Sequence, residues 1–272
     1  MSQTKKEGGA KNMLPAIIIP LCFVVAVIIY KFIFGNPANF MEGNPDNEPV
    51  KGGVAQYLGT IYKGGFIVPI LVTCLLVVIT FTIERFITLA AAKGNGSVES
   101  FIAKIRMMLA KNDFEAAHKE CDRQKGSVAN VVKAGLVVYK QMENDKNLDK
   151  ERKIAGIQKE LEEATTLELP MLSKNLVIIS TIASIATLLG LLGTVIGMIR
   201  AFGALAQAGA PDATALSTGI SEALINTALG IGASAIAIIF YNFFTSKIDS
   251  LTHGIDEAGY SIVQNFAANY KA

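Results

Sequence analysis

Two apolar stretches of the sequence carry small and polar residues that repeat at helical spacing. The members of the first set, three or four residues apart, are Thr187, Gly190, Thr194 and Gly197. The second set consists of Glu222, Asn226, Gly230 and Ala233, with Thr227 and Ser234 one position away. Residues three and four apart share one face of a helix, so each set would line a face with hydroxyl, amide or carboxyl groups. Such faces can border an ion path through a membrane, and their glycines, with Gly193, would let helices pack closely.

Glu222 is the ionisable member of these sets. A charged side chain at the bilayer centre costs about 2.5 to 3.5 kcal/mol on insertion scales, so it should face protein or water. It would instead lie at the outer surface if the apolar part of its helix begins after it. Small and hydroxyl residues also mediate helix packing without any transport role. Their co-occurrence with a carboxyl group favours an ion path lined by Thr194, Thr227 and Glu222, with Thr187 and Asn226 as further lining residues.

Four apolar runs must position these side chains, and each is long enough to cross a bilayer, which needs about 20 apolar residues. They cover residues 14–34, 66–92, 176–205 and 223–245. Together with a hydrophobic fraction of 51%, they exclude a soluble globular protein. Helices are the expected spanning form because each satisfies its own backbone, and the short alternating segments of a β-barrel are absent from the sequence. The predicted fold class is an all-α membrane protein with four transmembrane helices.

Basic residues predict the orientation of these helices. Of the 25 Lys and Arg residues, fifteen lie between Lys93 and Lys174 and three precede the first run. Residues 35–65 hold only two, and residues 206–221 hold none. By the positive-inside rule, the N-terminus, the central segment and the C-terminus are expected in the cytoplasm. Four crossings agree with this arrangement.

The expected order of segments follows from the runs and the charges. It is a cytoplasmic N-terminus (1–12), an extra membrane helix (13–34), an outer linker (35–65), a membrane helix (66–92), a cytoplasmic helical domain (93–173), a membrane helix (174–205), an outer loop with the start of the last helix (206–221), a membrane helix (222–246) and a cytoplasmic C-terminal helix (247–272). The first run also resembles a signal peptide, but its length and the lack of an A-x-A cleavage site favour a retained anchor.

Helical spacing of apolar residues gives finer expectations. A short surface helix is predicted at 54–62, and helices of the central segment are predicted to start at Ser97 and Asp113 and to cover 128–142. One long helix is expected from about Leu148 to about Leu205, because Pro170 can kink a helix without ending it. The last helix should begin near Asp212 and continue past residue 245.

Charged residues near the ends of the runs have structural explanations. Glu84 and Arg85 can reach the interface or form a charge pair with each other. Arg200 can reach the interface, or pair with Glu222 or with an acid of a partner. The three cysteines, which match no metal-binding spacing, are Cys22, Cys74 and Cys121.

Enzymatic chemistry is not expected. His118 and His253 are isolated, and the sequence contains no nucleophile–base pair, phosphate-binding loop or metal cluster. No cofactor or metal is therefore predicted. Thirteen acidic residues between Glu99 and Glu168 accompany the basic ones, which disfavours nucleic-acid binding. The expected partners are the lipid membrane and other proteins. One partner should supply the ion-carrying group, because the sequence offers neither a second buried carboxylate nor a histidine within the membrane.

Two segments carry a family resemblance. GLLGTVIGMIRAF at 190–202, followed by ISEALINTALGIGASAIAIIFYN at 220–242, resembles the paired signature of the MotA/TolQ/ExbB proton-channel family, most closely its ExbB-like subunits. The resemblance covers about residues 66–266 and includes ERF at 84–86. It implies that Thr194 and Thr227 face a pore with Glu222 beside it. It also implies a homopentameric ring around two helices of an ExbD-like partner, whose aspartate takes up and releases the proton.

The resemblance implies a subunit of the bacterial inner membrane that uses the proton-motive force to energise TonB-dependent outer-membrane transport, with a TonB-like protein as a further partner. The extra run at 14–34 departs from the common ExbB arrangement of three crossings with the N-terminus outside. One alternative is a TolQ-like subunit for envelope maintenance. Another, from a different class, is a non-conducting membrane scaffold that binds signalling proteins.

Overall fold

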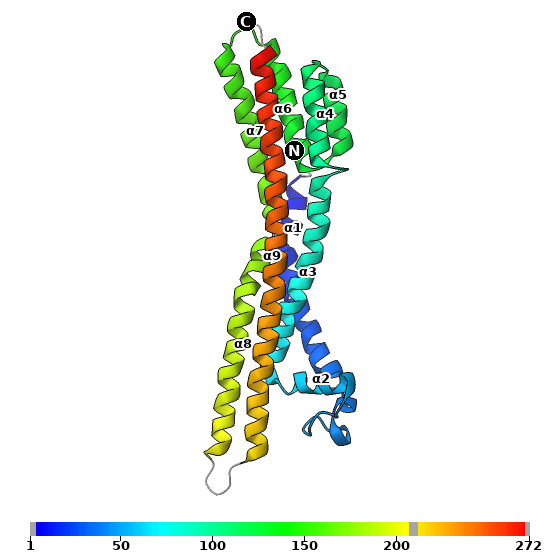
Figure 1. The fold of residues 1–272 in the computed structure, drawn as a ribbon, viewed down its shortest axis with the longest axis vertical. Coiled ribbons are helices and arrows are strands. Elements are labelled where there is room, and N and C mark those ends of the chain that lie inside the picture. The colour runs from blue at the N-terminus through cyan, green and yellow to red at the C-terminus, as the bar shows by residue number, and fades with distance from the viewer. Residues whose placement is uncertain (1–3, 207–211, 270–272) are drawn as a thin grey trace. The chain divides into compact units, whose positions relative to one another are not determined.

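The computed structural model describes residues 4–206 and 212–269, with side chains from residue 15 onward. Within these residues the regular elements are helices, apart from one isolated bridge between Phe40 and Pro49. The α-helices (Figure 1) are α1 Thr4–Ile28, α2 Gly53–Tyr62, α3 Val68–Lys93, α4 Val98–Ala110, α5 Phe114–Gln124, α6 Gly126–Asn144, α7 Lys150–Ser173, α8 Leu176–Leu205 and α9 Ala213–Asn269. Residues 1–3, 207–211 and 270–272, which belong to the predicted termini and outer loop, lie outside the described residues.

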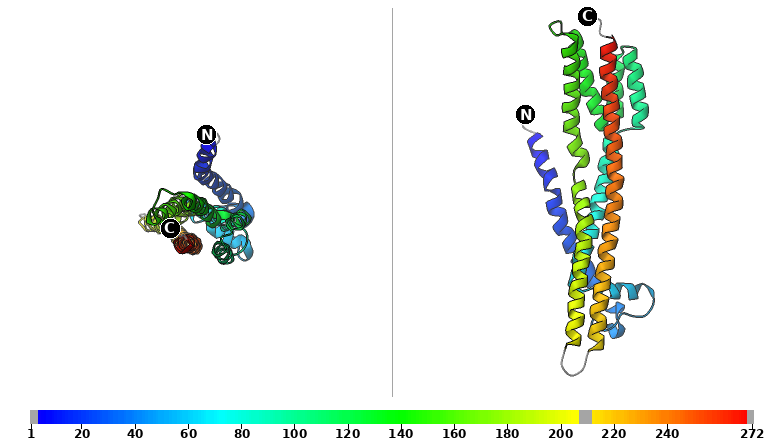
Figure 2. Two further views of the ribbon diagram at one scale, coloured as in Figure 1. Left: turned by 90° about the horizontal axis from the view of Figure 1, so that it is seen from above. Right: turned by 60° about the vertical axis from the view of Figure 1, so that its left-hand side comes forward.

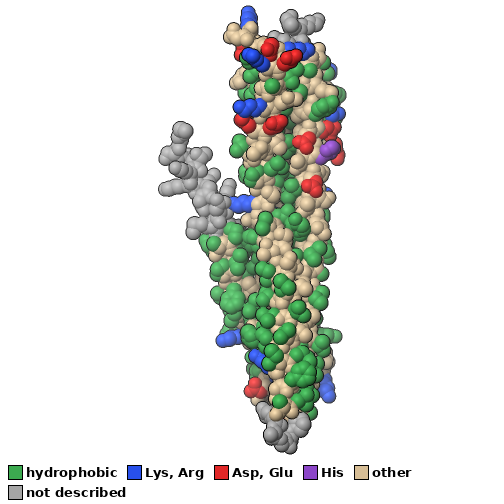
Figure 3. All heavy atoms as spheres, turned by 90° about the vertical axis from the view of Figure 1, so that its left-hand side faces the viewer, with side chains coloured by type: hydrophobic (Ala, Val, Ile, Leu, Met, Phe, Trp, Pro, Cys, Tyr) green, Lys and Arg blue, Asp and Glu red, His purple; other side chains and the backbone are tan. Residues whose placement is uncertain are grey.

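Four helical stretches are long and apolar enough to cross a membrane. They lie within Pro15–Phe34, Gly65–Ala110, Lys150–Leu205 and Ala213–Asn269. On the face drawn in Figure 3, hydrophobic side chains cover α8, and charged side chains gather on α7. Leu188, Leu191 and Ile199 of α8 are each more than half exposed in the single chain. A face of this kind is expected to contact lipid or another subunit.

The prediction of one continuous helix from Leu148 to Leu205 is wrong. α7 ends at Ser173 and α8 begins at Leu176. Asn175 between them has φ +63°, a left-handed conformation that interrupts an α-helix and that asparagine adopts more readily than most residues. The apolar spacing continues across the break, which is why the pattern alone suggested a single helix. Pro170 lies inside α7 and does not end it.

The chain forms two compact units. Unit 1 contains residues 1–82 and 177–241, and unit 2 contains residues 83–176 and 242–272. In unit 1, α8 and the first part of α9 run antiparallel and side by side (Figures 1 and 2). In unit 2, helices α4 to α7 pack with the end of α9. Its core includes an edge-to-face contact between Tyr139 and Phe266, with ring centroids 4.8 Å apart.

Local capping explains where several helices begin. Ser97 and Asp113 accept hydrogen bonds from the backbone of Ser100 and Ala116, at the starts of α4 and α5. Asp212 accepts hydrogen bonds at 3.0 Å from the backbone N–H groups of Thr214 and Ala215 at the start of α9. The sequence predicts helix starts at these positions, and α9 continues to residue 269.

The segment that leads to α2 packs back on the π-helical turn Ile29–Phe34, which follows α1 within unit 1. The Tyr30 ring stacks on that of Tyr62 in α2 with centroids 4.7 Å apart, and its hydroxyl donates to the Tyr62 carbonyl at 3.2 Å. The Asn39 amide donates to the carbonyls of Ile33 and Phe34 at 2.7 and 3.0 Å. These bonds satisfy carbonyl groups that a helix end leaves free. α2 occupies the region of the predicted short helix, and its position at a membrane surface stays a prediction.

Candidate functional site

Glycines bring the backbones of α8 and α9 into contact. A Cβ at Gly190 would lie 3.0 Å from the Asn226 carbonyl oxygen and 3.1 Å from the Gly230 Cα. A Cβ at Gly230 would lie 2.6 Å from the Ala186 carbonyl oxygen. Gly193 lies against the Asn226 side chain, and Gly197 lies against the backbone of α9. The four predicted packing glycines therefore all lie at the contact between the two helices.

Gly219 belongs to the same contact and is absent from the predicted set. A Cβ at Gly219 would lie 2.8 Å from both the Ala201 nitrogen and the Gly197 carbonyl oxygen. It precedes Glu222 at helical spacing on the same face of α9, so extending the spacing toward the N-terminus of the helix would have found it. Ser234, whose hydroxyl donates to the Ala183 carbonyl, is a further polar link between α8 and α9.

Thr194 and Thr227 meet at the centre of this contact. Their hydroxyls are hydrogen-bonded to each other across the two helices, and both side chains are half-buried. Each hydroxyl also lies near a carbonyl oxygen of its own helix, Gly190 at 3.3 Å and Ala223 at 3.1 Å. Thr187, on the same helix as Thr194, is exposed. The structure thus joins the two predicted hydroxyls into one polar pair within an apolar contact.

Glu222 is buried and held by Arg200. The Arg200 Nη1 lies 2.6 and 2.8 Å from the two carboxylate oxygens. The Glu222 side chain is 5% exposed, whereas that of Arg200 is 52% exposed. The guanidinium also lies over the Phe66 ring, 5.7 Å from its centroid. The sequence left three alternatives for Arg200: the membrane interface, Glu222 or an acid of a partner. The structure contains the pairing with Glu222, and this pairing provides the buried carboxylate with a counter-charge.

Asn226 turns toward the segment before α3. It is fully buried, and its amide nitrogen donates to the Gly64 carbonyl at 2.8 Å. Its Oδ1 has no hydrogen-bond partner among the described residues. The adjacent Gly65 has φ +76°, and a Cβ there would overlap the Glu222 carboxylate. Glu222 and Asn226 thus connect α9 to the Gly64–Gly65 turn, whereas the two threonines connect α9 to α8.

Glu84 and Arg85 form a second polar cluster, which belongs to unit 2. The Arg85 Nε and Nη2 each donate to a Glu84 carboxylate oxygen at 2.6 Å, and Nη1 donates to the Leu172 carbonyl at 3.0 Å. Arg85 is only 1% exposed. Asn175, the left-handed residue between α7 and α8, also donates to Glu84 at 3.4 Å. The pair therefore ties α3 to the end of α7.

Residues 129–257, which include both threonines and the ion pair of Glu222 and Arg200, match the profile of the MotA/TolQ/ExbB proton channel family. This part of the chain is therefore similar to the proton-channel family, and the four long apolar helices are those of a multi-pass membrane protein.

Curated relatives carry the names of two systems. The chain is 40% identical over 88 residues to the biopolymer transport protein ExbB-like 3 of Synechocystis sp., covering 32% of this chain and 42% of the relative. It is 29% identical over 124 residues to the Tol-Pal system protein TolQ of Pseudomonas aeruginosa, covering 46% and 54%. It is 38% identical over 72 residues to the biopolymer transport protein ExbB of Salmonella typhimurium, covering 26% and 30%. The matched segments span from under a third to about half of each relative's length.

Proposed function

We propose that this chain is an ion-channel and motor subunit of an ExbB–ExbD-type complex in a bacterial inner membrane. It uses the proton-motive force to energise TonB-dependent outer-membrane transport and has no enzymatic activity of its own. The observation that carries the proposal is the hydrogen-bonded pair of Thr194 and Thr227, placed between closely packed membrane helices inside the segment that matches the proton-channel family.

The proposed assembly completes a path that one chain cannot form. Copies of the chain, five in the proposed pentamer, surround two helices of an ExbD-like partner, with both termini of the chain in the cytoplasm and residues 35–65 in the periplasm. A ring of Thr194 and Thr227 then faces the partner's aspartate. The exposed apolar face of α8 supports this packing, because it needs lipid or protein to cover it.

The proposed mechanism assigns different tasks to the two kinds of polar group. A hydroxyl both donates and accepts hydrogen bonds, so the threonine ring can hold the partner's carboxyl group in either protonation state. Moving one elementary charge across 100 mV supplies about 2.3 kcal/mol, enough to bias which subunit face the partner prefers. Glu222 keeps a compensated charge through Arg200. It therefore acts as a fixed group beside the path, and the mobile proton resides on the partner.

Replacement of the hydroxyls tests the proposal. Thr194→Val and Thr227→Val keep the side-chain shape and remove the polar pair, so we expect partner-dependent uptake to fall at least tenfold while the complex still assembles. Thr181→Val is the matched control. Thr181 is exposed on α8 and its hydroxyl bonds to the Val177 carbonyl of its own helix at 2.7 Å. Normal uptake in both test variants, with normal assembly, would contradict the pore assignment.

A TolQ-like role in envelope maintenance is the second candidate, supported by the match of 124 residues to TolQ. Complementation separates the two. An ExbB-type subunit restores TonB-dependent uptake to cells lacking their own, whereas a TolQ-type subunit restores detergent resistance. A non-conducting scaffold predicts a third result, in which dissipating the ion gradient changes no activity of the complex.

A further inference from the structure

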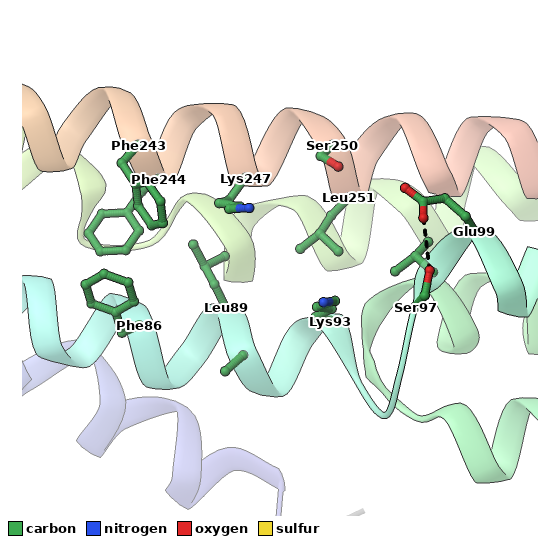
Figure 4. Close-up of a pocket in the computed structure, with 12 residues that line it drawn as sticks. Phe86, Leu89, Lys93, Ser97, Glu99, Phe243, Phe244, Lys247, Ser250 and Leu251 are labelled. Carbon is green, nitrogen blue, oxygen red and sulfur yellow. Dashed lines mark hydrogen bonds between the residues drawn. The ribbon is translucent and has the colours of Figure 1, made fainter.

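A cavity of about 370 Å³ lies between α3, the start of α4 and the second half of α9, within unit 2. The residues that line it are aromatic at one end and polar at the other (Figure 4). One end is walled by aromatic rings, Phe86 and Phe243 with Phe244 behind them, and the rings of Phe86 and Phe244 meet edge to face at 5.0 Å. The other end carries the hydrogen-bonded pair of Ser97 and Glu99.

Two lysines lie between these ends (Figure 4). Lys93 comes from the end of α3 and Lys247 from α9, and both are exposed. Neither forms an ion pair with a described residue. The Lys247 ammonium lies 5.7 Å from the centroid of the Phe243 ring. The cavity therefore offers two cations and an apolar wall to the same ligand.

The position of the two lysines along the chain indicates which chemical class of ligand would bind in the cavity. Lys93 is the first residue after the apolar run 66–92, and Lys247 is the first charged residue after the run 223–245. Where these runs cross a bilayer, both lysines are expected at the level where phospholipid headgroups meet the hydrocarbon core. With Glu99, the charged lining carries a net charge of +1, which complements one phosphodiester of charge −1.

We propose that this cavity binds the headgroup of an anionic glycerophospholipid, with its phosphate between Lys93 and Lys247. An acyl chain lies along Phe86 and Phe243, which are 46% and 42% exposed and provide apolar surface for it. The hydroxyl of Ser250 faces the same space and can donate to the phosphate or the glycerol. The site requires that α3 and α9 span a membrane, and it is independent of ion conduction.

Lipid titration of the purified chain tests the site. The full chain, delipidated in detergent, is titrated with phosphatidylglycerol or phosphatidylcholine, and bound lipids are counted by native mass spectrometry. We expect saturable binding of phosphatidylglycerol and much weaker binding of phosphatidylcholine. Lys93→Gln with Lys247→Gln should weaken phosphatidylglycerol binding by about 25-fold, since a lysine near anionic lipid contributes about 5-fold.

Two further variants separate the cavity from general surface charge. Lys119→Gln with Lys174→Gln removes the same net charge outside the cavity, Lys174 next to another apolar run, and should leave binding unchanged. Ala90→Trp fills the cavity but keeps both lysines, and should abolish binding while thermal unfolding remains cooperative.

Equal binding of the two lipids, equal loss in the control, or displacement by equimolar inorganic phosphate would overturn the proposal. So would loss of the lipid when an ExbD-like partner is co-expressed, because a protein segment would then occupy the cavity.

Discussion

At the residue scale, the ion pair between Arg200 and Glu222 shows how a carboxylate is kept in an apolar setting. A buried carboxylate without a counter-charge is strongly destabilising, and Arg200 provides that charge while its exposed part lies over Phe66. Gly65 makes room for the pair, because its φ of +76° and the lack of a Cβ let the turn approach the carboxylate.

Gly65→Ala should therefore destabilise the protein. The added Cβ would overlap the Glu222 carboxylate and would force a left-handed backbone on an L-residue, a cost of about 1 to 3 kcal/mol. The measurement is the thermal unfolding midpoint in detergent. Gly203→Ala is the matched control, because no heavy atom lies within 4 Å of a Cβ at that position. Equal midpoints for the two variants would contradict the proposed role of Gly65.

At the element scale, the contact between α8 and α9 depends on which face of each helix carries glycine. A Cβ at Gly230 would meet backbone atoms of Ala186 and Gly190 within 2.8 Å, whereas one at Gly232 would meet nothing within 4 Å. The two glycines are in the same helix but on different faces. Close approach of backbones through small residues is a common means of helix association in membranes.

Comparing these two glycines tests the contact directly. Gly230→Ala should destabilise the pairing of α8 with α9 by about 1 to 3 kcal/mol, because overpacking must push backbone apart. Gly232→Ala should cause no loss, since alanine favours a helix over glycine by about 1 kcal/mol. Unfolding in detergent measures both, and assembly of the purified complex provides a second readout. A larger loss for Gly232→Ala would refute the interpretation of the contact.

At the scale of the whole molecule, the uneven distribution of lysine and arginine predicts the topology. Lys51 lies in the linker that should be periplasmic, and Lys146 lies in the central segment that should be cytoplasmic. The three native cysteines are buried. Burial also raises the pKa of the Cys121 thiol to about 12, so this thiol stays protonated and unreactive near neutral pH.

Cysteine labelling in intact cells checks this topology. A membrane-impermeant maleimide at pH 7 should label Lys51→Cys from the periplasm and should label Lys146→Cys only after the inner membrane is permeabilised. The unsubstituted chain should remain unlabelled in its folded state and react only after denaturation. The reverse pattern for the two variants would invert the proposed orientation.

The sequence by itself determined the fold class and the main elements. Apolar runs long enough for a bilayer crossing form helices, because a helix satisfies all its backbone hydrogen bonds within one segment and the alternating segments of a β-barrel are absent from the sequence. The helix starts after Ser97, Asp113 and Asp212 were also predictable, since side-chain caps act locally. The repeat of glycine and threonine on two faces was likewise sufficient to indicate that α8 and α9 meet.

The tertiary structure alone decided the arrangement around those helices. The break between α7 and α8 consists of two non-helical residues, Lys174 with an extended ψ of 139° and the left-handed Asn175, which the surrounding apolar spacing hides. The sequence could not show what Arg200 contacts, because the membrane interface, Glu222 and an acid of a partner would each accommodate its charge. The orientation of Asn226 toward Gly64 and the cavity between Lys93 and Lys247 depend on segments far apart in the chain. Such contacts depend on which surfaces approach in space, and helical periodicity carries information only about one helix at a time.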